Sequence, residues 1–334
     1  MDIGPFLRGF MIVVTGGAGF IGSNLVAALE RRGSRVAISD WLGDSDKWRN
    51  LGKRDLEAIV APERLEDFLA AQGDEVEALF HMGAISSTTE KNADLIVETN
   101  LRLSQKLFRF CRDRNIPFIY ASSAATYGDG AAGFRDDESP EALAKLRPLN
   151  PYGWSKHLFD RWVGHRRKDG GPQVVGLKFF NVYGPNEYHK GGQRSVANQI
   201  YPFAARGEAF PLFKSHNPKY QDGGQLRDFI WVGDCVEVML WFLDHPQVSG
   251  LFNLGTGKAR SFADLAAAVY RAAGKEPRIA YRPMPDELRE KYQYFTEADM
   301  GKLRKAGYTA PFTALEDGIK QYVRDYLAAP DPYV

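Results

Sequence analysis

A glycine-rich turn between an apolar strand and a helix constrains this sequence more than any other feature. The apolar run Met11–Thr15 is short and rich in β-branched residues, which predicts a buried parallel strand. It leads into Gly16, Gly19 and Gly22, spaced G-x-x-G-x-x-G, and a helix is predicted over residues 24–32. The first glycine allows a tight turn, the second lets the backbone approach a pyrophosphate, and the third lets the helix pack on the sheet. The turn therefore predicts a dinucleotide site at a helix N-terminus.

Strands and helices alternate along the first half of the chain. Further strands are predicted over residues 35–39, 77–81, 117–121 and 174–179, and helices over 101–115 and 152–168. Such alternation is typical of right-handed βαβ units. We therefore expect an α/β fold with a Rossmann-type, doubly wound parallel sheet, in which ligands bind beyond the carboxyl ends of the strands.

The pattern changes after residue 180. Residues 184–225 are rich in Gly, Pro, Asn and Lys, whereas a strand predicted over 227–232 and a helix over 234–244 return to the first pattern. From residue 261 onward we expect helices with proline-containing connections. The expected domains are a dinucleotide-binding domain, residues 11–180 plus about 227–260, and a smaller, discontinuous C-terminal substrate-binding domain, about 181–226 plus 261–334.

Composition excludes several classes of partner. The net charge of +1 predicts neither a nucleic-acid partner nor an anionic membrane surface. No apolar run has the length of a membrane span, and residues 1–10 lack the apolar stretch of a signal peptide, so we expect a cytoplasmic protein. Cys111 and Cys235 form neither a disulfide nor a metal-binding pattern, so we expect buried thiols and no metal site.

An acidic residue at the end of the second predicted strand bears on the choice of cofactor. Asp40 holds the position from which a carboxylate usually bonds the adenosine ribose, which favours NAD. Lys47 and Lys53 follow in the next loop, where an ammonium group would neutralise the 2′-phosphate of NADP. The residues alone leave both cofactors open; NADP is our prediction, and NAD is the alternative.

A serine and a Y-x-x-x-K pair predict acid–base chemistry on an alcohol. Ser123 follows the strand over residues 117–121, so its hydroxyl is expected at the cleft. Tyr152 and Lys156 are spaced i, i+4 at the start of a helix and share one face. An ammonium group beside a phenol favours the phenolate and is expected to lower the tyrosine pKa. Such a tyrosine takes the proton of a substrate alcohol while a hydride leaves the same carbon.

The order of these three motifs resembles the extended short-chain dehydrogenases/reductases that act on nucleotide sugars. Other stretches resemble one branch, the ADP-L-glycero-D-manno-heptose 6-epimerases. The most specific are SSTTE over residues 86–90 and HKG over 189–191, which follows NVYGP; HMGA over 81–84, RDF over 227–229, FNLGTG over 252–257 and YQYFT over 292–296 agree with them.

The resemblance implies an isomerase that acts on ADP-D-glycero-D-manno-heptose, a precursor of the lipopolysaccharide core. C6 of the heptose carries an unactivated C–H bond, so inversion is expected to pass through a transient ketone. A single tyrosine does not easily serve both faces of that ketone. In this family a lysine supplies the second acid/base, and the motif places it at Lys190; a loop lysine that binds the ADP diphosphate is the alternative.

The same resemblance implies further contacts and a homo-oligomer, a pentamer in this family. Expected cofactor contacts, besides those already given, are Phe20, Ile21, Trp41, His81, Gly83, Ala84, Asn100, Lys156 and Val182. Expected substrate contacts are Ser86, Asn181, Gly192, Gln199, Phe213, His216, Arg227 and Tyr292. Two departures stand out: residues 58–62 lack the Asp that commonly caps the adenine ring, and 217–225 resembles an insertion.

Three other enzymatic activities and one non-enzymatic role fit parts of the pattern. A 4,6-dehydratase needs an acidic pair after the strand-end Ser/Thr, where this chain has Ala124 and Ala125. A UDP-hexose 4-epimerase shares the Ser, Tyr and Lys but needs no second base. A net NAD(P)-dependent sugar reductase would release its cofactor in each turnover. A non-enzymatic NADP-binding protein would usually have lost Tyr152 or Lys156, and this chain keeps both.

Overall fold

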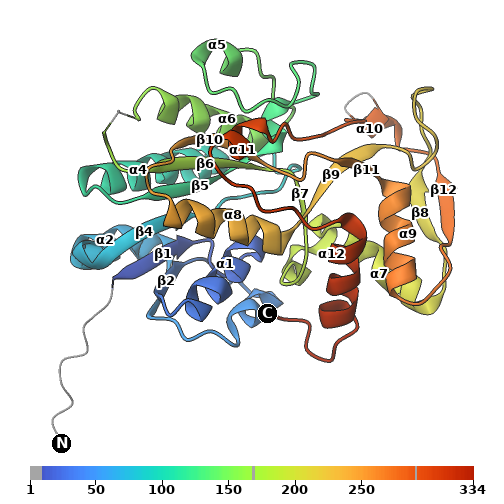
Figure 1. Ribbon diagram of the computed structural model, residues 1–334, viewed down its shortest axis with the longest axis horizontal. Coiled ribbons are helices and arrows are strands. Elements are labelled where there is room, and N and C mark those ends of the chain that lie inside the picture. Colours follow the sequence, from blue (N-terminus) through green and yellow to red (C-terminus); the bar gives the residue numbers. More distant parts are fainter. Residues whose placement is uncertain (1–9, 168–169, 290–291) are drawn as a thin grey trace, which may run out of the picture.

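The computed structural model describes residues 10–167, 170–289 and 292–334. The predicted end of a helix at residue 168 and the segment 1–9 lie outside the described residues. The chain forms a large sheet flanked by helices, and a smaller part that lies at the right of Figure 1.

Seven parallel strands form the large sheet, which confirms the expected α/β fold. Their order is β10-β6-β5-β4-β1-β2-β3. The direction in which strands are added reverses between β1 and β4, and such a switch point opens a crevice at the carboxyl ends of the strands. The strands are β1 (Met11–Thr15), β2 (Arg35–Ser39), β3 (Ala58–Val60), β4 (Val76–His81), β5 (Phe118–Ser123), β6 (Val174–Phe179) and β10 (Gly250–Leu254).

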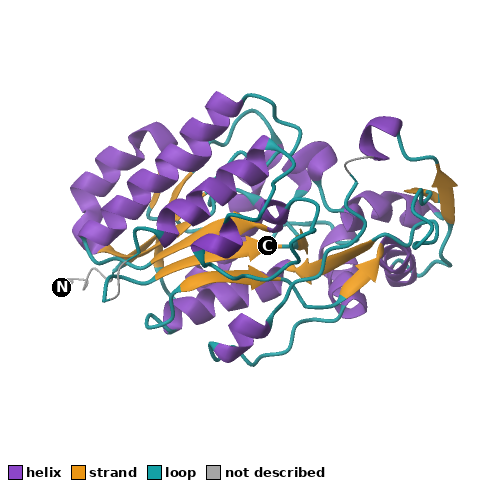
Figure 2. Cartoon of the chain, turned by 90° about the horizontal axis from the view of Figure 1, so that it is seen from above, coloured by secondary structure: helices purple, strands orange, loops and turns teal. Residues whose placement is uncertain are grey.

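Helices cover both faces of this sheet (Figure 2). On one face, Leu25 of α1 and Met239 of α8 pack with Ile12 and Val14 of β1; on the other, Phe108 of α4 and Phe159 of α6 pack in a second core. Because both faces are buried, β1, β2, β4, β5 and β6 are continuous apolar runs and were predicted, whereas β3 and β10 were not. The helices are α1 (Phe20–Arg31), α8 (Val232–Asp244) and α11 (Gly301–Lys305) on the first face, and α2 (Leu65–Gln72), α4 (Leu103–Asp113) and α6 (Pro151–Gly164) on the second.

The smaller part is built on two short sheets and three helices with a core of their own. Ile200, Val269 and Ile319 lie in that core and are completely buried. One sheet has the order β11-β9-β7, and in the other β8 pairs with β12. The elements are β7 (Asn181–Tyr183), β8 (Phe210–Phe213), β9 (Leu226–Trp231), β11 (Ala259–Ser261) and β12 (Ile279–Arg282), with α7 (Val196–Arg206), α9 (Phe262–Ala272) and α12 (Leu315–Tyr322).

Three details differ from the sequence-based expectation. Helix α1 begins at Phe20, earlier than residue 24, so its N-terminus lies directly at the glycine turn. The strand expected over 227–232 is β9, which belongs to the three-stranded sheet of the smaller part. After it, α8 packs on the large sheet and β10 is a strand of that sheet. Strand β12 interrupts the region from residue 261 onward, which was expected to be helical. The remaining α-helices of the described residues are short: α3 (Ala93–Ile96), α5 (Pro140–Leu143) and α10 (Asp286–Arg289).

Across the described ranges, no helix combines the length and the apolar character needed to cross a membrane.

Candidate active site

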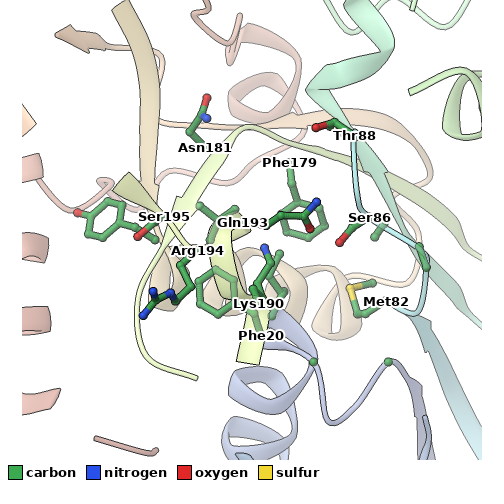
Figure 3. Close-up of a pocket in the computed structure, with 18 of the residues that line it drawn as sticks. Phe20, Met82, Ser86, Thr88, Phe179, Asn181, Lys190, Gln193, Arg194 and Ser195 are labelled. Atoms are coloured by element: carbon green, nitrogen blue, oxygen red, sulfur yellow. The ribbon is translucent and has the colours of Figure 1, made fainter. Parts of the chain in front are cut away.

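A cleft of about 1090 Å³ lies between the large sheet and the smaller part of the molecule. It collects residues from the ends of β1, β4, β5 and β6 and from the turn after β7. Figure 3 shows Lys190 beside Phe20, with Ser86 and Met82 on the facing side. Of the sequence-predicted residues, the cleft is lined by Gly16, Gly19, Phe20, Ile21, Gly22, Asp40, Lys47, Gly83, Ala84, Ser86, Ser123, Tyr152, Lys156, Asn181, Val182, Lys190 and Gly192.

The glycine turn is packed so closely that side chains are excluded from it. Gly16 has a φ of +67°, and a Cβ there would lie 2.6 Å from Gly83 Cα. A Cβ on Gly22 would lie 2.1 Å from the Gly16 carbonyl oxygen. Helix α1 has no side-chain cap and no acidic residue in its first turn, so its N-terminal N–H groups stay available to an anion. This cradle fits the diphosphate of a dinucleotide.

Two predicted cofactor contacts lie beneath the cleft wall instead of in it. Both ring nitrogens of buried His81 are taken, by Thr15 Oγ1 at 2.6 Å and by Ser104 Oγ at 2.7 Å. The amide of buried Asn100 accepts from the Ile85 N–H at 2.9 Å and donates to the Ile85 carbonyl at 3.0 Å. The two side chains therefore hold the loop after β4 in place.

The end of the cleft near β2 carries an ion pair. Lys47 Nζ lies 2.6 Å from Asp40 Oδ1, and the other carboxylate oxygen accepts the Ala18 N–H at 3.0 Å. Trp41 is exposed and does not line the cleft; its indole N–H donates to Glu63. Asp40 is thus paired with a cation at the position where a cofactor ribose would lie.

Ser123, Tyr152 and Lys156 lie together in the cleft. The Asn150 side chain caps α6 by accepting the Gly153 N–H at 2.8 Å, which places Tyr152 in the first turn. Lys156 is 3% exposed, and its amine makes no hydrogen bond with any described residue. Burial lowers the pKa of Lys156 to about 8, although Asp160 raises it.

The pKa of Tyr152 differs from the expectation. Burial raises the pKa of the phenol, and this outweighs the lowering by a hydrogen bond to Ser123. The direction is opposite to the expected lowering: desolvation of the phenolate is the largest effect on this pKa, and Lys156 makes no contribution to it. In this environment Tyr152 holds a proton that it is able to donate.

Lys190 is half-buried on the turn between β7 and α7. Its ammonium lies 5.5 Å from the ring centroid of Phe20, and burial lowers its pKa while Glu187 raises it. The cleft thus contains two groups able to exchange protons, Tyr152 from α6 and Lys190 from a separate element. Asn181 and Val182, just before this turn, line the same cleft.

Five predicted substrate contacts lie outside the lining. Arg227 lies 5.4 Å from the ring centroid of Tyr292 and 5.6 Å from that of Phe262, which does line the cleft. Phe213 meets the edge of Tyr292 at 6.4 Å between centroids. The His216 N–H donates to Tyr294, and the Gln199 amide donates to the Arg194 carbonyl. Arg227, Tyr292 and Phe213 thus form one cluster outside the lining of the cleft. His216 adjoins this cluster through Tyr294, whose ring meets the edge of Tyr292.

Several lining residues were not singled out from the sequence. Thr88, Thr89 and His189 belong to stretches that carried the resemblance, and those stretches were the signal that pointed to them. Met82, Tyr183 and Phe229 lie in such stretches too, and Ala121, Ser122, Phe179 and Phe180 lie at the ends of predicted strands. No sequence pattern marked the others, which are Gln193, Arg194, Ser195, Val196, Ala197, Phe262 and Leu265. Among the residues that the structure describes, no cluster of His, Cys, Asp or Glu could hold a metal ion.

Comparison with known proteins gives consistent results. A model of the NAD dependent epimerase/dehydratase family matches residues 12–255. The ADP-L-glycero-D-manno-heptose-6-epimerase of Nitratidesulfovibrio vulgaris strain Hildenborough is 52% identical over 97% of this chain and 100% of its own length. The crystal structure of the Helicobacter pylori ADP-L-glycero-D-manno-heptose-6-epimerase is similar, with a TM-score of 0.78 and 29% identity over 97% of this chain and 99% of that one. The Thermus thermophilus UDP-glucose 4-epimerase, solved with NAD, gives a TM-score of 0.75 and 28% identity over 94% of this chain and 98% of that one.

Proposed function

The chain belongs to the NAD dependent epimerase/dehydratase family and, within it, to the ADP-L-glycero-D-manno-heptose-6-epimerases, and from this we propose that it converts ADP-D-glycero-D-manno-heptose to ADP-L-glycero-D-manno-heptose. The observation that carries the proposal is the presence of two proton-transfer groups from different elements, Tyr152 and Lys190, in one cleft with the dinucleotide cradle.

The chemistry follows from the substrate. Removing a proton from C6 would leave an unstabilised carbanion, whereas removing a hydride from the same carbon together with the hydroxyl proton gives a neutral ketone. A bound nicotinamide supplies the hydride acceptor and returns the hydride. One side chain takes the proton of the C6 hydroxyl, and the other protonates the oxygen after the ketone has presented its opposite face. The sugar is neither oxidised nor reduced overall.

Ser123, Tyr152, Lys156 and Lys190 have distinct tasks in this scheme. The Ser123 hydroxyl hydrogen-bonds the reacting oxygen, and the buried Lys156 amine would hold the cofactor. In the proposed direction Tyr152 takes the hydroxyl proton and Lys190, in its charged form, returns a proton to the oxygen; in the reverse reaction the two roles exchange. The two reset by proton exchange with solvent.

The nicotinamide cofactor is NADP in this proposal. The pairing of Lys47 with Asp40 supports it, because a paired carboxylate repels a 2′-phosphate less than a free one, and Lys47 can turn to the phosphate. Homo-oligomer formation, a pentamer by resemblance, and a cytoplasmic location also belong to the proposal. Light scattering coupled to gel filtration measures the first directly.

The decisive experiment uses purified protein, without added cofactor, and ADP-D-glycero-D-manno-heptose in D₂O. Wild type, Tyr152→Phe, Lys190→Ala and the exposed-surface control Lys320→Ala run side by side, with the C6 epimers separated by chromatography. Wild type and the control should equilibrate the epimers, and each active-site variant should lose about 10²-fold or more in kcat. The product should carry no deuterium at C6, because the hydride comes back from the cofactor.

Other results would point elsewhere. Deuterium at C6 would replace hydride return by proton abstraction. A Lys190→Ala variant with raised KM and normal kcat would make Lys190 a diphosphate ligand. A wild type that leaves the heptose unchanged even with NADP and NAD supplied, yet converts UDP-glucose, would be a 4-epimerase.

A further inference from the structure

A buried carboxylate lies three residues before Lys190, and the proposed chemistry does not use it. Glu187 is 0% exposed, and burial raises its pKa. Its Oε1 accepts hydrogen bonds from Ser195 Oγ at 2.6 Å and from the Tyr322 hydroxyl at 2.9 Å. Its Oε2 accepts the Ser195 backbone N–H. Burying a charged group is costly unless hydrogen-bond donors compensate, and three donors do so here.

Neighbouring donors fix the ionised form of this carboxylate. Asn198 donates twice, from its backbone N–H to Ser195 Oγ at 3.2 Å and from its amide to the Tyr322 hydroxyl oxygen at 2.8 Å. Because both hydroxyl oxygens already accept from Asn198, their own protons turn toward Glu187. Three donors then meet Glu187, and a carboxylate that only accepts is the form that satisfies them.

The same contacts close the turn that carries Lys190. Glu187 stands at the start of this turn, and Ser195 caps α7 at its end, so the bonds between them tie the two ends together. The Lys190 N–H donates to the Glu187 carbonyl at 3.0 Å. Tyr322 adds an anchor in α12, in the core of the smaller part. Between the two ends the backbone turns at Gly191, which has a φ of +54°.

The charge of Glu187 also acts on Lys190, and it is the favourable charge in a mostly cationic neighbourhood. Lys190 makes no ion pair with any described residue, and its ammonium faces the Phe20 ring. The other charged or titratable groups around the turn are Lys47 from the loop after β2, His189 and Arg194 from the turn itself, Tyr188 beside Glu187, Tyr322 from α12, and Tyr152 across the cleft. Burial and the cations Lys47 and Lys190 lower the pKa of His189 to about 4, so its ring is neutral.

We propose that Glu187 is a positioning residue for Lys190: its ionised carboxylate fixes the turn against α7 and α12 and keeps the Lys190 amine available in its charged form for proton return. This inference rests on the proposed role of Lys190 in the epimerisation. It names no contact between Glu187 and substrate.

Two variants separate charge from anchoring. Glu187→Gln keeps the shape, removes the charge and places an amide N–H₂ against donors. It should lower kcat about 10-fold or more at nearly unchanged KM and move the basic limb of the kcat–pH profile about one unit lower. Tyr322→Phe keeps the charge and removes one donor; it should lower kcat less and leave the limb in place. Glu208→Gln, an exposed pair with Arg206, is the matched control and should match wild type.

A second readout does not depend on activity. Reductive ¹³C-methylation and NMR titration, with Lys190→Arg to assign the resonance, report the pKa of Lys190 in each variant. The inference predicts a lower value in Glu187→Gln than in wild type and Glu208→Gln. Unchanged titration together with unchanged kcat in a folded Glu187→Gln would overturn it. If Glu187→Gln does not fold, Tyr322→Phe with a kcat and KM equal to wild type would overturn the anchoring. A fully active Lys190→Ala variant would contradict the proposed function instead, whatever the measured pKa of Lys190.

Discussion

Lys178 and Asp160 form an ion pair that is closed off from solvent, with 2.8 Å between Nζ and Oδ2 and side-chain exposures of 1% and 0%. Asp160 follows Tyr152 and Lys156 on the same face of α6, at successive i, i+4 positions. It also accepts the Ser122 hydroxyl at 2.7 Å, beside Ser123. The pair therefore joins β6, the end of β5 and the face of α6 that carries Tyr152 and Lys156.

Breaking this pair should be costly. Lys178→Met leaves Asp160 buried without its cation, so we expect the free energy of unfolding to fall by about 3–5 kcal/mol. Urea denaturation measures the change. Lys106→Met, which removes an exposed pair with Glu66, should cost less than about 1 kcal/mol. The double variant Lys178→Met/Asp160→Asn should recover part of this loss. If Lys178→Met alone were as stable as the Lys106→Met control, the buried pair would not contribute to stability.

Local patterns predicted the elements whose cause is local. The strands of the large sheet are apolar runs because both faces are covered, and Gly16 and Gly22 are required by backbone contacts within a few residues or at the neighbouring strand end. Strands β8 and β12 are short and contain or adjoin proline; β8 is half-buried apart from buried Leu212, and β12 is mostly exposed, so no buried run marked them. Helix α1 starts at Phe20 because Gly19 can serve as an extended N-cap, which apolar periodicity does not reveal.

The parts of the site that the sequence missed depend on distant partners. Glu187 is an ordinary acidic loop residue until Tyr322 of α12 is brought against it. His81 reads as a cleft residue at a strand end, but Thr15 and Ser104 take both of its nitrogens. The pKa of Tyr152 follows from burial, which no spacing of residues reports.

Cofactor binding should weaken at alkaline pH through Lys156. Burial lowers the pKa of this amine to about 8, so it is charged below that pH and neutral above it. If the charged form holds the cofactor, affinity for NADPH should be flat below pH 8 and fall by up to about tenfold per pH unit above it. Fluorescence titration from pH 6.5 to about 9.5 checks this. Lys156→Met should bind more weakly and lose the pH dependence; an equally steep fall in that variant would assign the effect to another group.

Lys47 should discriminate between the two cofactors. Its ammonium is already at the Asp40 end of the cleft, and a 2′-phosphate offers it a more highly charged partner than a ribose hydroxyl. Lys47→Ala should raise the Kd of NADPH about tenfold more than that of NADH. Lys53 pairs with Asp331 instead, so Lys53→Ala should leave both Kd values unchanged. Equal losses for both cofactors in Lys47→Ala would argue that the lysine does not read the 2′ position.

Arg227 should hold the diphosphate of the nucleotide sugar. Within the described ranges its guanidinium makes one hydrogen bond, to the Leu226 carbonyl at 2.8 Å, and no ion pair; it lies between the Tyr292 and Phe262 rings. Burial lowers its pKa, yet a guanidinium stays charged, so an anion is the partner that would offset its desolvation.

The neighbouring strand offers a matched control for this prediction. Arg260 of β11 is the register partner of Arg227 but is already paired with Glu316 at 2.6 Å. Arg227→Gln should raise the KM for ADP-heptose about 10-fold or more and leave kcat within a few fold, because a diphosphate contact is the same in the ground state and the transition state. Arg260→Gln should leave both constants near wild type. A fall in kcat at constant KM in Arg227→Gln would instead connect Arg227 to the reacting carbon, against its place behind the cleft wall.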